Sequence, residues 1–162
     1  MAGISHAGYG NFSEIMFLFP IYILLTGAIL VFIAGSLKAG RPLLSVISFL
    51  AALSAAITLV PFLFFSQPRI IGYFGGFLSF KIEPFACTIA LGLSVFAAGC
   101  SAWLAEHYRQ PGTDSIFTLL LAAVGFSTAS IFAANLPSMT VFTGLTFLVL
   151  LLLWKRSRLE AK

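Results

Sequence analysis

Long apolar segments alternate with short polar connections along this chain, and the pattern predicts transmembrane helices. Five segments contain no Asp, Glu, Lys, Arg or His, and each approaches the roughly 20 helical residues that cross a bilayer core. The expected spans are 15–37, 43–65, 85–104, 115–134 and 139–154. The sequence therefore predicts an all-α polytopic membrane protein with about five transmembrane helices, and residues 1–162 form a single transmembrane domain.

The one long connection, residues 66–83, differs from the other loops because it is rich in glycine and in apolar residues. Its sequence, SQPRIIGYFGGFLSFKIE, places Gly75-Gly76 between runs of Ile, Tyr and Phe. A Gly-Gly step between aromatic and β-branched runs is typical of a β-hairpin. We expect a short hairpin between the second and third helices that lies flat on the membrane–water boundary, because its flanks are too apolar to float in water.

Prolines predict kinks in the first two spans, and the absence of early basic residues predicts that the first span is retained. Pro20 and Pro61 lie inside them and predict kinks, which neighbouring helices tolerate in lipid. No Lys or Arg precedes Lys38, so the first apolar segment lacks the basic region of a cleaved signal peptide. We therefore expect it to be a retained transmembrane span.

The distribution of Lys and Arg predicts the orientation in the membrane. The first connection, the third connection and the tail 155–162 together carry seven, whereas the hairpin side carries two. The positive-inside rule then places the C-terminus in the cytoplasm and the N-terminus and hairpin outside, in a plasma (inner) membrane. On this map Trp103 and Trp154 fall at the cytoplasmic boundary, where membrane proteins concentrate aromatic residues.

Composition excludes a soluble protein. Hydrophobic residues make up 60% of the chain and charged residues 9%, against about 25% charged in an ordinary soluble domain. The spans leave no room for a soluble catalytic domain. The net charge of +4 does not indicate nucleic acid here, because the basic residues lie in short loops and at the C-terminus, where they orient the chain in the membrane. Cys87 and Cys100 lie on one predicted helix about 20 Å apart, which is too far for a disulfide, so we expect two small buried hydrophobes.

Small residues at a spacing of four predict which helix faces meet protein, because such residues permit close helix packing in lipid. The third span carries Ala86, Ala90, Ser94, Ala98 and Ala102. The fourth span carries Gly125, Ala129 and Ala133. These two stripes predict that the third and fourth helices form an intimate pair.

The five spans contain no ionisable residue, and this absence decides the expected chemistry. Ion and proton carriers usually place such groups within the membrane. At the boundaries, Glu106 and Arg109 are three apart and are expected to form a solvated ion pair, with His107 as a surface residue rather than a proton relay. Glu83 has two readings: a contact with a neighbouring subunit, or an interfacial acid favourable to the helix dipole.

The sequence offers no catalytic, metal or cofactor motif. It contains no nucleotide-binding loop, zinc spacing, haem ligand pair or nucleophile elbow. Ser127, Thr128 and Ser130 are hydroxyls that can bond back to their own helix and do not form a site. We expect no cofactor and no catalytic residue in this chain.

Two short stretches carry a resemblance to a known family. Gly76-Phe-Leu-Ser-Phe-Lys-Ile-Glu-Pro-Phe85 is similar to a motif like G-L-L-x-V-D-P-F, with Glu83 in place of Asp. Ala134-Asn-Leu-Pro-Ser-Met-Thr-Val-Phe-Thr-Gly-Leu-Thr146 is similar to A-x-D-L-x-x-x-F-x-G-L-E. With the hairpin, residues 15 to 150 resemble the N-terminal part of the antiporter-like membrane subunits of respiratory complex I, energy-converting membrane-bound hydrogenases and multi-subunit sodium/proton antiporters.

The resemblance implies a role inside a redox-driven proton- or sodium-pumping complex. The family's membrane glutamate falls at Thr146, which cannot carry a proton, and the family continues with further helices that bear its central lysines. We therefore expect an accessory structural subunit, either a degenerate copy or one part of a split subunit. Its partners would be other membrane subunits and the lipid bilayer, not nucleic acid, with Gly75, Gly76, Glu83 and Pro84 at the hairpin as the link to the next subunit.

Two other functions stay open from the sequence. The chain could be a small transporter or channel component that works as a homo-oligomer, with a pore lined by Ser and Thr. It could also be a membrane assembly or lipid-binding scaffold that associates transiently with its partners.

Overall fold

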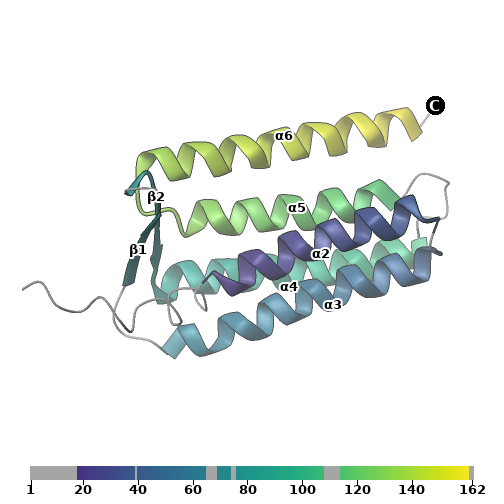
Figure 1. The fold of residues 1–162 in the computed structure, drawn as a ribbon. Coiled ribbons are helices and arrows are strands. Elements are labelled where there is room, and N and C mark those ends of the chain that lie inside the picture. The colour runs from purple at the N-terminus through teal and green to yellow at the C-terminus, as the bar shows by residue number, and fades with distance from the viewer. Residues whose placement is uncertain (1–17, 39, 65–68, 74–75, 108–113, 161–162) are drawn as a thin grey trace, which may run out of the picture.

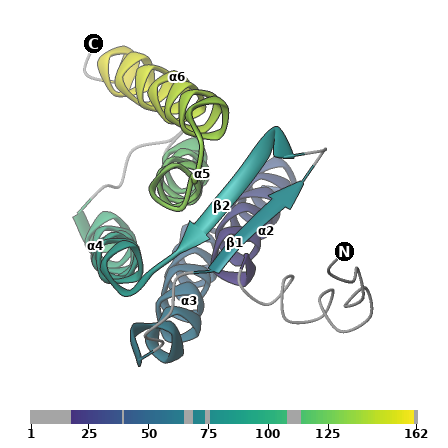
Figure 2. The same ribbon diagram turned by 90° about the vertical axis from the view of Figure 1, so that its left-hand side faces the viewer.

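In the part of the chain that the structure describes, five α-helices form a bundle, and a hairpin lies across one end of it (Figures 1 and 2). The computed structural model describes residues 18–38, 40–64, 69–73, 76–107 and 114–160. The elements in chain order are α2 (Phe19–Ser36), α3 (Arg41–Leu59), the 3₁₀-helix η1 (Val60–Phe64), β1 (Arg69–Tyr73), β2 (Leu78–Ile82), α4 (Pro84–His107), α5 (Asp114–Ile131) and α6 (Leu136–Glu160).

Four of these helices are long and apolar enough to cross a membrane: α2, α3 together with η1, α4 and α6. The apolar part of α5, Ser115–Ile131, is shorter. It is packed against α2, α6 and, less extensively, α4. The chain is therefore a helical, membrane-embedded protein with one small antiparallel sheet.

Several predicted boundaries differ from the observed ones. Pro20 lies in the first turn of α2, where its missing N–H costs no hydrogen bond, so the predicted kink there is wrong. At Pro61 the α-helix has already given way to η1. The helix α6 continues past Trp154 to Glu160, so the expected basic tail begins as helix, because residues 155–160 include several good helix formers.

The hairpin pairs β1 with β2 in antiparallel register, from Arg69 opposite Ile82 to Tyr73 opposite Leu78. Gly76 adopts a φ of 91°, a conformation that glycine enters without strain, so this position of the predicted turn requires glycine. Gly75 lies outside the described residues. The predicted hairpin is thus present, and it lies across the end of the helix bundle (Figure 2).

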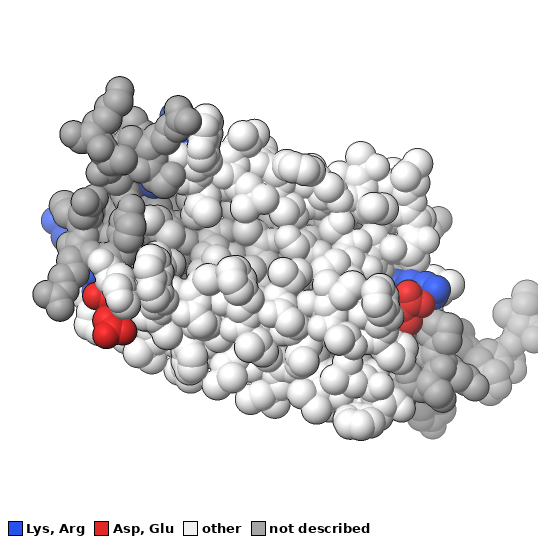
Figure 3. All heavy atoms as spheres, turned by 180° about the vertical axis from the view of Figure 1, so that it is seen from behind, with Lys and Arg blue, Asp and Glu red and all other residues white. Residues whose placement is uncertain are grey.

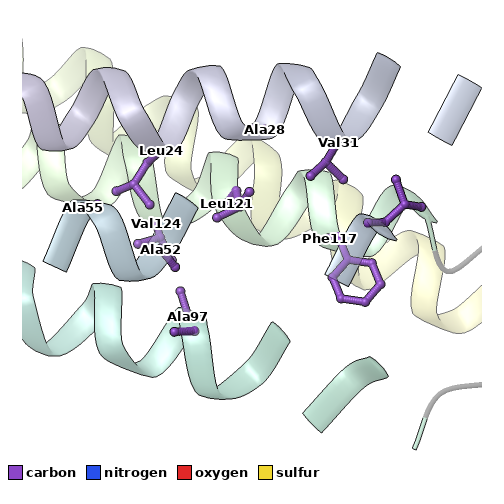
Figure 4. Packing of buried hydrophobic residues seen from close by; sticks show 11 residues of the cluster. Leu24, Ala28, Val31, Ala52, Ala55, Ala97, Phe117, Leu121 and Val124 are labelled. Atoms are coloured by element: carbon purple, nitrogen blue, oxygen red, sulfur yellow. The ribbon is translucent and has the colours of Figure 1, made fainter. Parts of the chain in front are cut away.

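Buried apolar side chains from four helices fill the middle of the bundle (Figure 4). The labelled residues converge from α2, α3, α4 and α5: Leu24, Ala28, Val31, Ala52, Ala55, Ala97, Phe117, Leu121 and Val124. Many of them are alanine, so the helix backbones lie close together. A Cβ added to Gly27 of α2 would lie only 2.6 Å from the Cβ of Ala51 on α3, so these two helices are in close contact at this point.

The helix α6 lies at the edge of the bundle. It packs along α5 and also meets β2 over a few residues. Only 11% of the residues in its most apolar stretch are buried inside the chain, against 39% for α4. Figures 1 and 2 show α6 on the outside of α5, with its far side uncovered.

Candidate functional site: the hairpin anchor and the polar positions of the bundle

Asn135 joins the hairpin to the start of α6. It is the residue before α6, and its Oδ1 accepts a hydrogen bond from the backbone N of Ser138 at 3.0 Å, as an N-cap does. Its Nδ2 donates to the carbonyl oxygens of Gly76 at 2.8 Å and Phe77 at 3.1 Å, and to the Oγ of Ser79 at 3.1 Å. One side chain therefore caps a helix and holds the turn of the hairpin.

The turn between α5 and α6 also pairs with β2 through its backbone. The N–H of Lys81 donates to the carbonyl of Phe132 at 2.6 Å, and the N–H of Ala134 donates to the carbonyl of Ser79 at 2.7 Å. Phe80 and Ala133 form an antiparallel β-bridge. The residues after α5 thus satisfy backbone groups on the open edge of β2 that would otherwise be unpaired.

Ser138 completes the anchor. Its Oγ accepts a hydrogen bond from the N–H of Ser79 at 2.8 Å and bonds to the Oδ1 of Asn135. The side chain of Ser138 is fully buried. Sequence reasoning missed the role of residues 135–138 as an anchor, because the side chain of an N-cap residue does not reveal from the sequence that it reaches a turn 59 residues away.

Glu83 lies between β2 and α4 and pairs with Lys81, whose Nζ is 2.8 Å from the Oε2 of Glu83. The Lys81 side chain keeps 41% of its surface exposed, and the Glu83 side chain keeps 38%. Pro84 opens α4, as its position after the hairpin predicts, because the first turn needs no donor from it. Of the four residues predicted for a partner contact, Glu83 and Pro84 lie together where β2 leads into α4, whereas Gly76 lies in the turn at the other end of β2. The fourth residue, Gly75, is not described.

Charged groups occupy the two ends of the bundle. In the described part of the chain, Lys, Arg, Asp, Glu and His occur only in the hairpin, the connections or the outer two turns of a helix. Figure 3 shows the charged atoms at opposite ends, with a broad uncharged surface between them. Glu106 and His107 are exposed at the end of α4. His107 stacks on Trp103 with ring centroids 5.0 Å apart. Arg109, the predicted partner of Glu106, lies outside the described residues.

Buried hydroxyls link α3 to α4. The Oγ atoms of Ser48 and Ser101 are 2.7 Å apart, and the Oγ of Ser45 donates to the carbonyl of Ser101 at 3.1 Å. All three side chains are buried. The Oγ of Ser101 also bonds back to the carbonyl of Ala97 at 2.9 Å. These hydroxyls satisfy each other inside the chain instead of lining an open path.

The hydroxyls of Thr128, Ser130 and Thr146 on α5 and α6 also form their hydrogen bonds within the chain. Thr128 is buried and bonds back to the carbonyl of Val124, which follows the expectation for this helix. Ser130 instead contacts the Oγ1 of Thr143 on α6 at 2.7 Å. Thr146, at the position of the family glutamate, is half-buried and bonds back to the carbonyl of Phe142 at 2.9 Å.

The predicted packing stripes lie mainly inside the chain. Ala86, Ala90, Ser94 and Ala98 are buried in α4, whereas Ala102 is exposed and Ser101 takes the buried place instead. The helix α4 packs more extensively along α3 than along α5. The expected intimate pair of the third and fourth helices is therefore not the main contact of either helix.

The stripe on α5 divides between two neighbours. Ala129 belongs to the same buried cluster as Ala86 and Ala90 of α4. Gly125 instead faces α2, since an added Cβ would lie 2.9 Å from the Cδ2 of Leu25. Ala133 lies in the turn after α5 and pairs with β2. Small residues at one spacing thus serve three different contacts.

Cys87 is buried, Cys100 is half-buried, and neither forms a disulfide. Within the described ranges, no group of three or more His, Cys, Asp or Glu side chains could hold a metal ion. Comparison of the chain with known protein families, curated proteins and solved structures finds no match.

Proposed function

We propose that this chain is an accessory membrane subunit of a larger redox-driven ion-pumping complex, of the complex I or membrane-bound hydrogenase type, and that it has no ion path of its own. The observation that carries the proposal is the position of the ionisable side chains, which in the described helices lie only near the ends. A proton or cation crossing the bilayer needs groups with which to exchange or pair. The chain therefore supplies packing surface and a sealed core.

The outward face of α6 is the surface on which we place a neighbouring subunit. Phe147, Leu148 and Leu151 are exposed there. Thr140 and Gly144, four residues apart on the same side, are exposed as well. A Cβ added to Gly144 meets no atom within 4 Å, so this position is open to a helix from outside. Small residues four apart allow a second helix to approach closely, whereas lipid requires only apolar bulk.

The parent complex follows from the two stretches that carry the family resemblance. In the fold the two stretches contact each other, because Ala134 and Asn135 bond to Gly76 and Ser79 at the hairpin anchor. By analogy with that family, we place the hairpin outside the cytoplasm and the C-terminus in the cytoplasm, in a plasma membrane. We also count α5 as a transmembrane span, which brings the total to five. The basic residues Lys38, Arg41, Lys155 and Arg156 at the end away from the hairpin favour this orientation.

The experiment is a comparison of complexes in mild detergent. The tagged full chain is produced in cells that express its neighbours, and the wild type is expected to migrate on a native gel with other membrane subunits. Gly144→Leu should reduce the amount of that complex several-fold, because leucine blocks the close approach of a helix to α6. Gly92→Leu is the matched control, since Gly92 is also exposed in a helix and open to a side chain.

Wild-type chain that migrates alone would contradict the accessory role. Equal amounts of the complex from Gly144→Leu and from the wild type would contradict only the docking face.

The rival function, a homo-oligomeric channel, requires polar groups along a path, whereas Ser48 and Ser101 pair with each other inside the chain. Purified chain in liposomes is therefore expected to move no more sodium or protons than empty liposomes do.

A further inference from the structure

We propose that the groove between α2, α5 and α6, at the end of the bundle away from the hairpin, binds an anionic phospholipid through its phosphate. Two adjoining recesses of about 230 and 400 Å³ form this groove. Both are lined by Phe32 of α2, Ser115 and Thr118 of α5, and Arg156 of α6. The inference goes beyond the proposed function and does not depend on it.

Polar and apolar lining residues occur in the same order on all three helices. Ser36 lies one turn closer to the end of the bundle than Phe32 on α2, Ser115 one turn closer than Leu119 on α5, and Arg156 one turn closer than Leu152 on α6. Residues four apart lie on the same helix face. The groove is therefore polar toward the end of the bundle and apolar toward its middle, which matches a molecule with a polar head and an apolar chain.

The charge at the polar end selects an anionic head. Lys155 and Arg156 both line the larger recess. Arginine and lysine are the side chains that bind phosphate most strongly in proteins. Basic pockets between transmembrane helices are a recurring site for lipid headgroups.

Thr118 gives an independent indication of a ligand. Its Oγ1 is buried and has no hydrogen-bond partner among the described residues, unlike Thr128 on the same helix, which bonds back to its own backbone. A buried hydroxyl without a partner costs free energy and calls for an explanation. Thr118 lines both recesses, and a rotation of its side chain would bring the hydroxyl to a phosphate oxygen in the groove.

The test measures lipid retained by the purified full chain with native mass spectrometry, after addition of phosphatidylglycerol or phosphatidylcholine. We expect phosphatidylglycerol to bind at least ten-fold more tightly. The double variant Lys155→Gln with Arg156→Gln should lose that preference. Lys38→Gln is the control, because Lys38 is exposed at the same end of the bundle but does not line the groove.

Thr118→Val keeps the proposal testable if the double variant does not fold. Without lipid, the valine variant should melt at a higher temperature than the wild type, because the unpaired buried hydroxyl is gone. With phosphatidylglycerol it should gain less stability than the wild type gains.

Three results would overturn the proposal. One is equal retention of the two lipids by the wild type, and another is a loss of preference in Lys38→Gln as large as in the double variant. The third is binding of inorganic phosphate alone at millimolar concentration with no retention of phosphatidylglycerol, because the groove would then hold a free ion rather than a lipid.

Discussion

The side-chain amide of Asn135 donates a hydrogen bond to the carbonyl oxygen of Gly76, although 59 residues separate them in the chain. Gly76 lies in the turn of the hairpin, and Asn135 directly precedes α6 and caps it. This contact fixes the hairpin to the turn between two helices. The hairpin consequently presents a defined surface at the end of the bundle, as a link to a neighbouring subunit requires.

Asn135→Asp should release the hairpin while it leaves the cap of α6 in place. The retained carboxylate oxygen can still accept from the N–H of Ser138, but its second oxygen replaces a donor and faces the carbonyls of Gly76 and Phe77. Loss of these bonds costs about 1–3 kcal/mol. Amide exchange at Lys81 should become roughly ten-fold faster or more, measured by hydrogen–deuterium exchange.

Thr140→Val is the control for this variant. It removes a hydroxyl from the first turns of α6 that bonds only to the carbonyl of Leu136. Its exchange at Lys81 should match the wild type. Unchanged protection of Lys81 in Asn135→Asp would mean that the backbone pairing with Phe132 holds the hairpin without Asn135.

Alanine at three glycines should produce graded effects on stability. Gly27→Ala should destabilise the chain by about 1–3 kcal/mol, because the Cβ of Ala51 lies 2.6 Å away and cannot rotate aside. Gly125→Ala should cost less, because it meets first the flexible end of Leu25. Gly144→Ala meets nothing and should be neutral or stabilising by up to about 1 kcal/mol. Thermal unfolding in detergent tests this order. A Gly144→Ala variant that is less stable than the Gly27→Ala variant would contradict the packing described for these glycines.

Ser48 and Ser101 should show an energetic coupling in a double-mutant cycle. Their Oγ atoms are 2.7 Å apart and buried between α3 and α4. Hydrogen bonds between membrane helices contribute about 0.6 kcal/mol on average, with a maximum near 1.7. Unfolding free energies of both alanine variants and their combination should give a coupling in that range. Ser94, which is buried but bonds only to its own helix, should show no coupling with Ser48.

Glu83→Gln should change the stability of the isolated chain by less than about 1 kcal/mol, because the ion pair with Lys81 is partly exposed. The small difference should disappear in about 1 M salt, where charges are screened. Thermal unfolding at low and high salt measures it. If the same variant also lowers the yield of the assembled complex several-fold, the first of the two interpretations of Glu83, a contact with a neighbouring subunit, is supported over that of an interfacial acid.

The order of helices and the hairpin could be predicted because both depend on local pattern. Apolar runs of bilayer length predict helices, and Gly75-Gly76 between β-prone runs predicts the turn. The end of α6 was harder to predict, because several residues after Trp154 are charged and yet also favour a helix. Hydropathy marks where the apolar stretch ends, not where the helix ends.

The choice of helix neighbours could not be predicted. These helices are apolar on every side, so periodicity does not indicate which face is inside. Gly125 looked equivalent to the small residues of α4, yet it packs against Leu25 of α2. The hairpin anchor was also hidden, because Asn135 reveals its local capping role but not its distant acceptor at Gly76.

The most direct test of the accessory role is the mass of the particle that contains this chain. Full-length tagged chain is extracted from membranes of its own host in mild detergent and weighed by native mass spectrometry. The account predicts one heteromeric particle, with other membrane subunits present in fixed ratio to the 17.4 kDa chain. A particle built only from copies of this chain would contradict it.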